Sequence, residues 1–402
     1  MRVLLADKLS PRVATELEAA GCAVTSDPSL EGDALREALD AVQPEVLVVR
    51  STRVTDAHLE ASASLSLVIR AGAGVNTIDV EAASGRGVYV ANCPGKNAIA
   101  VAELTLGHLI NLDRRIADNV ADLRAGRWAK RTYSKADGLY GKTLAVLGCG
   151  SIGVEVIKRA QAFGMNVRAW SRSLTPEAAA ALGVEHSASP LAACRGADAL
   201  SVHLALSPET RGLVGRELLE ALNRGAYVIN TSRGEVLDQP ALIEAIDTRG
   251  LRAGLDVFAD EPGAGDDHFA DPIGAHPSVY GTHHIGASTQ QAVEQVGQAV
   301  IDIVARYLLK GTVLNCVNLA TETVATHLLV VRHADRVGVL ASVLDGLRRD
   351  GVNVQEMENI IFRGARAACA RLHIDRAPSA GTVTELEAAD SIFALSLVAL
   401  EA

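Results

Sequence analysis

Residues 1–92 alternate short apolar runs with amphipathic segments. Short apolar runs predict buried strands, whereas apolar positions three and four residues apart predict helices. The expected strands are Arg2–Ala6, Val46–Val49, Leu67–Ile69 and Val88–Val90, and the expected helices lie near Pro11–Ala20, Asp33–Ala41 and Asp79–Ser84. Such alternation indicates a parallel sheet with helices on both faces.

A long helical pattern, Ala98–Leu123, leads into a second series of apolar runs. The strands expected there are Thr143–Leu147, Val167–Trp170, Ala199–His203, Ala226–Asn230, Leu251–Phe258 and Ser278–Thr282. We expect one doubly wound domain over residues 97–289. The helical pattern Gln290–Leu309 is expected to return to the first sheet. The first domain would then be discontinuous, comprising residues 1–96 and 290–318, with a cleft between the two domains.

The tail from Thr323 has a different pattern. Its expected elements are strand Ala325–Val331, helix Val337–Arg349, strands Val354–Phe362 and Ala367–Ile374, helix Thr382–Ala388 and strand Ile392–Leu400. This β-α-β-β-α-β order is typical of a ferredoxin-like α+β domain, here residues 323–402. The fold class expected is therefore α/β, with two Rossmann-like or flavodoxin-like parallel-sheet domains and a small ferredoxin-like domain.

Composition narrows the classes of function. The chain has 402 residues, 49% of them hydrophobic, and a net charge of −10 without a long basic run, which argues against nucleic acid as a partner. The six cysteines are scattered without a C-x-x-C pair, so no metal site is expected. No apolar segment reaches the roughly 18 residues of a membrane span, and no signal peptide is visible. We expect a cytoplasmic protein without membrane contact.

The stretch Thr143–Gly153 reads T-L-A-V-L-G-C-G-S-I-G, a short apolar run followed by glycines at G-x-G-x-x-G spacing. Gly148 allows the sharp turn from strand to helix, Gly150 lets a pyrophosphate approach the backbone, and Gly153 lets the helix pack closely. Free N–H groups and the helix dipole then favour a phosphate at this helix N-terminus. The motif between strand and helix predicts dinucleotide binding.

Three ionisable residues directly follow strands of the second sheet: Arg233, Glu261 and His284. Strands of a parallel sheet end at one edge, so all three side chains can face the crevice that holds the cofactor. His284 would be the acid–base group, although from spacing alone His283 serves equally. Glu261 would fix the imidazole tautomer and raise its pKa, and Arg233 would bind a substrate carboxylate. Asp256 either approaches the cofactor or pins its own loop.

Loops of the first sheet carry further basic groups. Arg50, Ser51 and Arg53 follow one expected strand, and Arg70 with the turn Gly72-Ala73-Gly74 follows the next. Loops at this edge of a parallel sheet are favoured positions for binding sites. Arginines beside a glycine turn are suited to hold an anion.

Eight stretches together resemble the D-isomer-specific 2-hydroxyacid dehydrogenases. They are V-V-R-S-T-R-V-T from Val48, I-R-A-G-A-G-V-N-T-I-D-V-E-A-A from Ile69, P-G-K-N-A-I-A-V-A-E from Pro94, V-L-G-C-G-S-I-G from Val146, L-S-P-E-T-R-G-L from Leu206, G-A-Y-V-I-N-T-S-R-G-E-V-L-D from Gly225, D-V-F-A-D-E-P from Asp256 and H-I-G-A-S-T from His284. They are spread over nearly all of the range 45–290.

The resemblance implies an Arg–Glu–His catalytic set at Arg233, Glu261 and His284, because the family's base precedes I-G-A. It implies a substrate carboxylate on the backbone of Ala73 and Gly74. The cofactor positions implied are Gly148, Gly150, Ser151, Ile152, Gly153, Val101, Thr231 and Asp256, together with Ser171 and Arg172. The helix Ala98–Leu123 resembles the family's dimer contact, which implies a homodimer or homotetramer. The tail is similar to an ACT domain, a fold that often binds amino acids between two copies.

Within the family, the basic residues favour a phosphorylated substrate. Arg50, Ser51, Arg53 and Arg70 match the phosphate-binding groups of members that oxidise D-3-phosphoglycerate to 3-phosphohydroxypyruvate for L-serine biosynthesis. Lys130 and Arg131 match a basic stretch of that branch, which reaches the neighbouring subunit's site. A phosphate needs several cationic donors, whereas the carboxylate of glyoxylate or hydroxypyruvate needs one arginine. The tail favours the same branch, since such tails serve feedback by serine.

Two departures from the family pattern keep alternatives open. NAD-dependent members place an Asp after the second strand of the nucleotide-binding domain. In this chain the corresponding expected strand ends at Trp170 and is followed by Ser171-Arg172-Ser173, and an arginine suits the 2′-phosphate of NADP. The cofactor is therefore NAD or NADP, with NADP at least accepted, and an NADPH-dependent hydroxypyruvate or glyoxylate reductase is the alternative enzyme. A nucleotide-sensing, corepressor-like binding protein is a further alternative.

The second departure lies in the tail. The ACT effector loop often reads H-x-N-x-P-G, but here His333, Asp335 and Gly338 stand in H-A-D-R-V-G. These residues are the candidates for binding L-serine or another amino acid. A tail that only builds the oligomer is the competing expectation.

Overall fold

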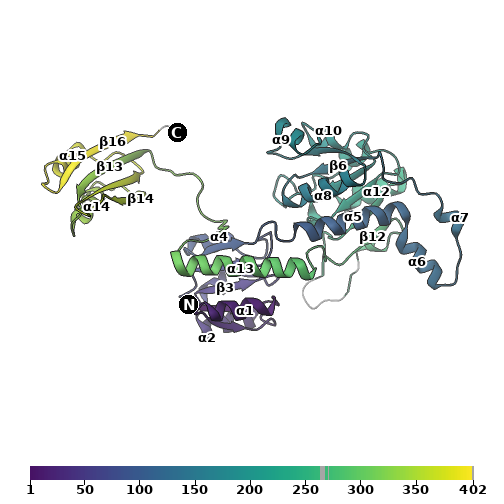
Figure 1. Cartoon of the computed structure of the whole chain (residues 1–402), viewed down its shortest axis with the longest axis horizontal. Helices are drawn as coiled ribbons and strands as arrows, with labels where there is room; N and C mark the ends of the chain where they lie inside the picture. Colours follow the sequence, from purple (N-terminus) through teal and green to yellow (C-terminus); the bar gives the residue numbers. More distant parts are fainter. Residues whose placement is uncertain (263–267, 270, 401–402) are drawn as a thin grey trace. The chain divides into compact units, whose positions relative to one another are not determined.

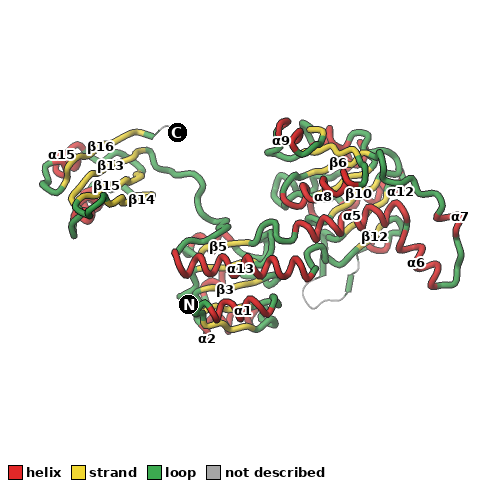
Figure 2. Tube along the Cα trace, viewed as in Figure 1, coloured by secondary structure: helices red, strands yellow, loops and turns green. Residues whose placement is uncertain are grey.

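The computed structural model describes residues 1–262, 268–269 and 271–400. The chain divides into two compact units, Met1–Asn318 and Leu319–Ala402. The first unit contains two parallel sheets and the second an antiparallel one (Figures 1 and 2). The expected fold class is confirmed, and most expected elements are present with ends that differ by a few residues.

The first sheet has five parallel strands in the order β2-β1-β3-β4-β5. The strands are β1 (Arg2–Leu5), β2 (Ala23–Ser26), β3 (Val46–Val49), β4 (Leu67–Arg70) and β5 (Tyr89–Asn92). One face packs against α1 (Pro11–Ala19) and α13 (Gln290–Lys310), and the other against α2 (Gly32–Val42), α3 (Asp56–Glu60) and α4 (Val80–Gly85). The helix α13 thus contributes Val296, Val300 and Val304 to the core of this sheet.

The second sheet has seven parallel strands in the order β12-β11-β10-β9-β6-β7-β8. The strands are β6 (Thr143–Leu147), β7 (Asn166–Trp170), β8 (Glu185–His186), β9 (Ala199–Val202), β10 (Tyr227–Asn230), β11 (Arg252–Leu255) and β12 (Val279–Gly281). One face packs against α5 (Ala98–Arg114) and α8 (Ser151–Ala162). The opposite face packs against α10 (Pro190–Cys194), α11 (Arg216–Ala221) and α12 (Gln239–Arg249). Shorter elements are α9 (Pro176–Ala181), η1 (Gly234–Val236) and η2 (Pro272–Ala275).

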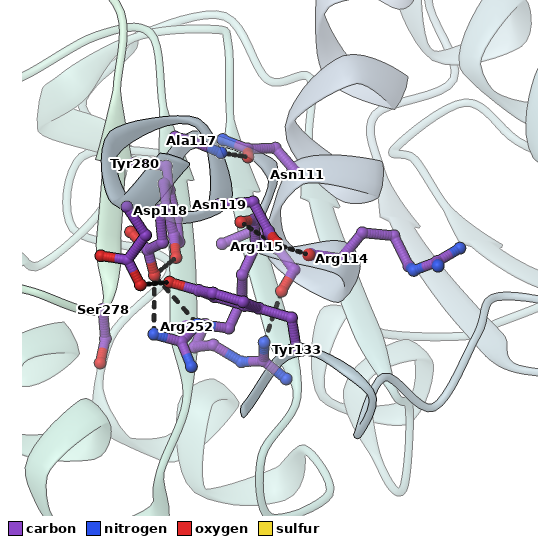
Figure 3. A network of polar contacts seen from close by, with 12 residues as sticks. Asn111, Arg114, Arg115, Ala117, Asp118, Asn119, Tyr133, Arg252, Ser278 and Tyr280 are labelled. Atoms are coloured by element: carbon purple, nitrogen blue, oxygen red, sulfur yellow. Dashed lines mark hydrogen bonds and ion pairs between the residues drawn. The ribbon is translucent and has the colours of Figure 1, made fainter. Parts of the chain in front are cut away.

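The expectation of one helix over Ala98–Leu123 was wrong. The helix breaks at Arg115, whose backbone is left-handed with φ +50°, and α6 (Ile116–Arg124) follows. Asp118 Oδ2 holds the break by accepting hydrogen bonds from Arg115 Nε at 2.9 Å and from Tyr280 Oη at 2.8 Å (Figure 3). Tyr280 lies on β12, so a distant part of the chain stabilises the bend. The apolar periodicity of Ala98–Leu123 therefore could not predict it.

Beyond this break the chain forms a protruding arm, which we define as α6, α7 (Lys130–Tyr133) and the segment between them. Its apolar side chains are poorly covered in this chain: Ile116, Leu123 and Trp128 are exposed, Trp128 to 81%. Arg115 stacks over the Tyr133 ring at 5.2 Å, which ties α7 to the break (Figure 3).

The second unit has a four-stranded antiparallel sheet in the order β14-β15-β13-β16. Its elements are β13 (His327–Ala334), α14 (Val339–Arg349), β14 (Val354–Ile361), β15 (Ala367–Ile374), α15 (Ala380–Glu387) and β16 (Ile392–Ala399). They follow the expected ferredoxin-like order. Val343 and Leu347 of α14 and Leu386 of α15 close a core over this sheet.

Among the described residues, no helix combines the length and apolar character needed to cross a membrane. Within the same ranges, no group of His, Cys, Asp and Glu side chains is arranged to hold a metal ion. All six cysteines are free thiols.

Candidate active site

A cavity of about 570 Å³ opens between the two parallel sheets of the first unit. Loops after strands of both sheets line it. The residues singled out from the sequence that lie in its wall are Arg70, Ala73, Gly74, Val101, Gly150, Ser151, Ile152, Gly153, Thr231, Arg233, Asp256 and His284. The fold therefore brings most of the candidate cofactor and catalytic residues to one place.

The glycine loop fits a dinucleotide pyrophosphate. Gly148 has φ +98°, and a Cβ there would lie 2.3 Å from the His203 carbonyl oxygen. A Cβ at Gly153 would lie 2.0 Å from the carbonyl oxygen of Gly148, whereas a Cβ at Gly150 would meet nothing within 4 Å. The open side of Gly150 and the first turn of α8 thus present backbone N–H groups to the cavity, as pyrophosphate binding requires.

His203 also lines this cavity. Its Nε2 contacts Ser201 Oγ at 2.7 Å, and its buried Nδ1 has no hydrogen-bond partner among the described residues. Burial lowers the pKa of His203 to about 3, so the ring is neutral.

His284 and Glu261 form a hydrogen-bonded pair, with His284 Nδ1 and Glu261 Oε2 2.7 Å apart. Burial would raise the pKa of Glu261, but hydrogen bonding and charge from His284, the Phe258 N–H and the charge of Arg233 together lower it. An ionised carboxylate only accepts hydrogen bonds, so Nδ1 of His284 is the donor. The remaining ring nitrogen, Nε2, is then the atom able to exchange a proton with a ligand.

The Arg233 guanidinium lies against the glycine turn of the first sheet. Its Nη1 donates to the Ser232 carbonyl at 2.6 Å, and Asn230 Nδ2 donates to the Arg233 carbonyl at 2.8 Å. A Cβ at Gly74 would lie 2.5 Å from Arg233 Nη2. Because Gly74 has no side chain, the Arg233 guanidinium fits against it, and the backbone of the turn lies beside this positive charge.

Arg70 adds a second guanidinium, which is partly buried. Its Nε donates to the Arg50 carbonyl at 2.9 Å, and a Cβ at Gly72 would overlap its Nη1. Burial, followed by repulsion from Arg233 and Arg50, lowers the pKa of Arg70 to about 10. Three positive charges this close are stabilised by a bound anion, which removes the repulsion.

Asp7 organises the loop that carries Arg50. Its Oδ2 accepts backbone hydrogen bonds from Arg50 at 2.7 Å, Ser51 at 3.2 Å and Thr52 at 3.1 Å, and Ser51 Oγ donates to Oδ1 at 2.9 Å. Burial opposes ionisation of Asp7, but these donors lower its pKa overall. The candidate Ser51 is therefore engaged with Asp7, on the loop that follows β1.

Lys8 and Asn97 were missed by sequence reasoning. Both line a smaller hollow together with Arg50 and Arg70, and buried Oδ1 of Asn97 has no partner among the described residues. Lys8 closely follows β1, at the same edge as Arg50 and Arg70. That position was a signal in the sequence that could have identified it.

Eight of the catalytic, cofactor and substrate candidates lie outside the residues that line the two cavities: Ser51, Arg53, Lys130, Arg131, Gly148, Ser171, Arg172 and Glu261. Ser171 and Arg172 directly follow β7, at the edge that bears the glycine loop. Lys130 lines a separate hollow within the arm. Their assignments stay predictions, as do the roles of the other candidates.

The effector candidates belong to the second unit. His333 is 1% exposed, and its ring contacts the Ala334 carbonyl at 2.8 Å and Asn359 Oδ1 at 3.2 Å. Asp335 follows β13, and Gly338 has φ +91° where it precedes α14. His333 is thus engaged within the fold, and amino-acid binding here stays a prediction.

Comparison with known proteins identifies the class to which this arrangement belongs. Residues 106–286 match the family described as D-isomer specific 2-hydroxyacid dehydrogenase, NAD binding domain. The chain belongs to the D-isomer-specific 2-hydroxyacid dehydrogenase family and carries its nicotinamide-dinucleotide-binding domain.

Two curated relatives are D-3-phosphoglycerate dehydrogenases. The one from Methanocaldococcus jannaschii is 36% identical over 86% of this chain and 66% of its own length. The one from Mycobacterium tuberculosis is 38% identical over 85% of this chain and 63% of its own length. The chain thus spans about two thirds or less of the curated relatives it matches.

Solved structures include relatives with either cofactor. The NAD⁺-bound 3-phosphoglycerate dehydrogenase of Entamoeba histolytica is 25% identical with a TM-score of 0.65, covering 79% of this chain and 99% of that one. An NADPH-dependent glyoxylate/hydroxypyruvate reductase of Sinorhizobium meliloti, bound to NADP and malonate, is 25% identical with a TM-score of 0.66, covering 79% and 96%.

Proposed function

We propose that this protein oxidises D-3-phosphoglycerate to 3-phosphohydroxypyruvate with NAD or NADP, a reaction of L-serine biosynthesis. The observation that carries the proposal is the cluster of Arg50, Arg70 and Arg233 beside the hydrogen-bonded pair Glu261–His284. A substrate with both a carboxylate and a phosphate matches several cations better than a substrate with one charged group. The relatives named D-3-phosphoglycerate dehydrogenase support the same choice.

Each side chain has a defined task in this mechanism. Arg233 binds the carboxylate in bidentate fashion and polarises the neighbouring oxygen, while backbone N–H groups at Ala73 and Gly74 hold the carboxylate's other side. His284 Nε2 accepts the hydroxyl proton during oxidation and returns it during reduction. Glu261 stabilises the imidazolium that forms. When bound, the nicotinamide ring supplies or accepts the hydride.

A substrate panel tests the proposal. Steady-state rates with D-3-phosphoglycerate, hydroxypyruvate and glyoxylate should give the highest kcat/KM for the phosphorylated substrate. Arg70→Gln should lower that kcat/KM about 10²-fold, since hydrogen bonds to charged groups contribute roughly 1.5–3 kcal/mol each. Glyoxylate, which has no phosphate, serves as the internal control. A wild-type preference for glyoxylate or hydroxypyruvate would instead support the reductase.

The second candidate is an NADPH-dependent hydroxypyruvate or glyoxylate reductase, favoured by Ser171-Arg172 after β7. For either reaction we expect NADP(H) to be accepted. Arg172→Ala should lower kcat/KM for NADPH about tenfold, the effect of losing one charge-assisted hydrogen bond, and leave the value for NADH nearly unchanged. Rates with both cofactors test this, and a wild-type kcat/KM more than about a hundredfold higher with NAD would contradict it, a gap of over 2.7 kcal/mol.

The proposal extends to assembly and regulation. The exposed apolar side chains of the arm support a homodimer or homotetramer, in which Lys130 and Arg131 approach the neighbouring subunit's site. A second copy would cover Trp128. We also propose three domains: a substrate-binding domain of residues 1–96 and 290–318, a nucleotide-binding domain of residues 97–289, and a ferredoxin-like domain of residues 323–402. The ferredoxin-like domain would bind an amino-acid effector such as L-serine. The proposed location of the protein is the cytoplasm.

A further inference from the structure

His284 has an unusual backbone conformation. It is a non-glycine residue with φ +51°, in the left-handed region that side chains with a Cβ rarely adopt. Such a conformation persists only where surrounding contacts determine it. The contacts that hold His284 therefore also set the direction of its imidazole.

Asp256 supplies these contacts. Its carbonyl oxygen accepts the His284 N–H at 2.8 Å, Oδ1 accepts the Ile285 N–H at 2.9 Å, and Oδ2 accepts the Gly286 N–H at 2.8 Å. A Cβ at Gly286 would lie 2.9 Å from Oδ2, so glycine is needed for this approach. Asp256 is 1% exposed, and its carboxylate is surrounded by donors.

A second residue orients Asp256. Thr282 Oγ1 lies 2.6 Å from Asp256 Oδ1 and 3.1 Å from Nε2 of His108, which lies on α5. A carboxylate accepts hydrogen bonds, so the threonine hydroxyl donates to Asp256 and must accept from His108. Burial lowers the pKa of His108 against the opposing effect of Asp256, so its ring is neutral. His108 is therefore the tautomer with the proton on Nε2.

The second sheet has space for the His108 imidazole, because a glycine lies opposite it. Gly254 lies inside β11, and a Cβ there would lie 2.8 Å from Cβ and 3.1 Å from Nδ1 of His108. Glycine inside a strand weakens it and often marks the close approach of another group. His108 is 4% exposed, so a polar ring occupies a position on α5 where an apolar side chain would pack at no polar cost.

We propose that His108 is a positioning residue for the reaction: through Thr282 and Asp256, it fixes the left-handed turn from which His284 projects. The inference rests on the proposed function in one respect, the assignment of His284 as the acid–base group. A displacement of about 1 Å at a catalytic group lowers turnover by up to 10²-fold, so a small relaxation of this turn is measurable.

Two substitutions at position 108 separate positioning from packing. His108→Met retains bulk but removes the donor, whereas His108→Gln retains an N–H near the position of Nε2. Relative to wild type, His108→Met should lower kcat about tenfold with the KM for the cofactor within about twofold, as misplacement of a reacting group predicts. His108→Gln should restore most of kcat. Thr282→Val, which removes the bridging hydroxyl, should lower kcat similarly and add little to His108→Met.

Hydrogen exchange in the cofactor-free protein provides a readout independent of activity. The amides of Ile285 and Gly286 should exchange at least about tenfold faster in His108→Met than in wild type, and near the wild-type rate in His108→Gln. Wild-type exchange and kcat in both His108→Met and Thr282→Val would overturn the proposal, as would equal losses in His108→Met and His108→Gln. If wild type turns over none of the panel substrates, the proposed function fails, but these exchange rates still decide the positioning role.

Discussion

His284→Ala is expected to lower kcat about 10³-fold, within the range by which a positioned acid–base group accelerates proton transfer. Without the imidazole, the hydroxyl proton has no acceptor at the position set by Glu261, whose carboxylate lies 2.7 Å from Nδ1. Absorbance of the reduced nicotinamide measures the rate in both directions. The KM for the cofactor should change little, because the glycine loop is untouched.

The neighbouring His283 provides the matched control. It is exposed and outside the lining of the cavity that Arg233 and His284 line together, so His283→Ala should retain kcat within about threefold, as expected of a surface substitution. If His284→Ala kept wild-type turnover, or if His283→Ala lost as much, the assignment of the acid–base group would be wrong.

The other large effect is expected at Arg233. Arg233→Gln should lower kcat/KM about 10³-fold, because removing one partner of a desolvated charge pair costs roughly 2–5 kcal/mol and each 1.4 kcal/mol is a factor of ten. Arg233→Lys should recover only part of this loss, since an ammonium cannot form the two parallel hydrogen bonds of a guanidinium. Saturation kinetics with each substrate of the panel measure the effect.

Arg211 serves as the control for charge alone. It is an exposed arginine of the same sheet region, paired with Glu235 at 4.0 Å and absent from the cavity wall. Arg211→Gln should leave kcat/KM nearly unchanged. Equal losses in the Arg211 and Arg233 variants would indicate a general electrostatic effect and contradict carboxylate binding by Arg233.

Much of the architecture could be predicted because a buried strand requires apolar residues at neighbouring positions of the sequence. β3 is four consecutive buried apolar residues, and β9 is four consecutive buried residues of which three are apolar, so each appears in the sequence as a short, largely apolar run. The strands β2 and β8 were missed because they lie at sheet edges and are largely exposed. The bend at Arg115 was missed because its stabilising partner Tyr280 lies on another element.

Some parts of the candidate site could likewise be predicted from the sequence, and others could not. The motif spacing located Gly148, Gly150 and Gly153, since strand, turn and helix follow one another directly. Arg233, Glu261 and His284 could be expected together because parallel strands end at one edge, but the hydrogen bond between Glu261 and His284 could not. The close packing of the Arg70 guanidinium against Gly72 could not be predicted, because it depends on the tertiary structure.

By itself, the sequence determined the alternation of strands and helices, the phosphate-binding loop and the set of rim residues, because each depends on neighbours along the chain or on the common edge of a sheet. Only the tertiary structure decided that Asp7 holds the Arg50 loop and that His108, through Thr282, holds Asp256. His108 and Thr282 are separated by 174 positions. Periodicity reports which face of an element is buried, but not which distant side chain lies against it.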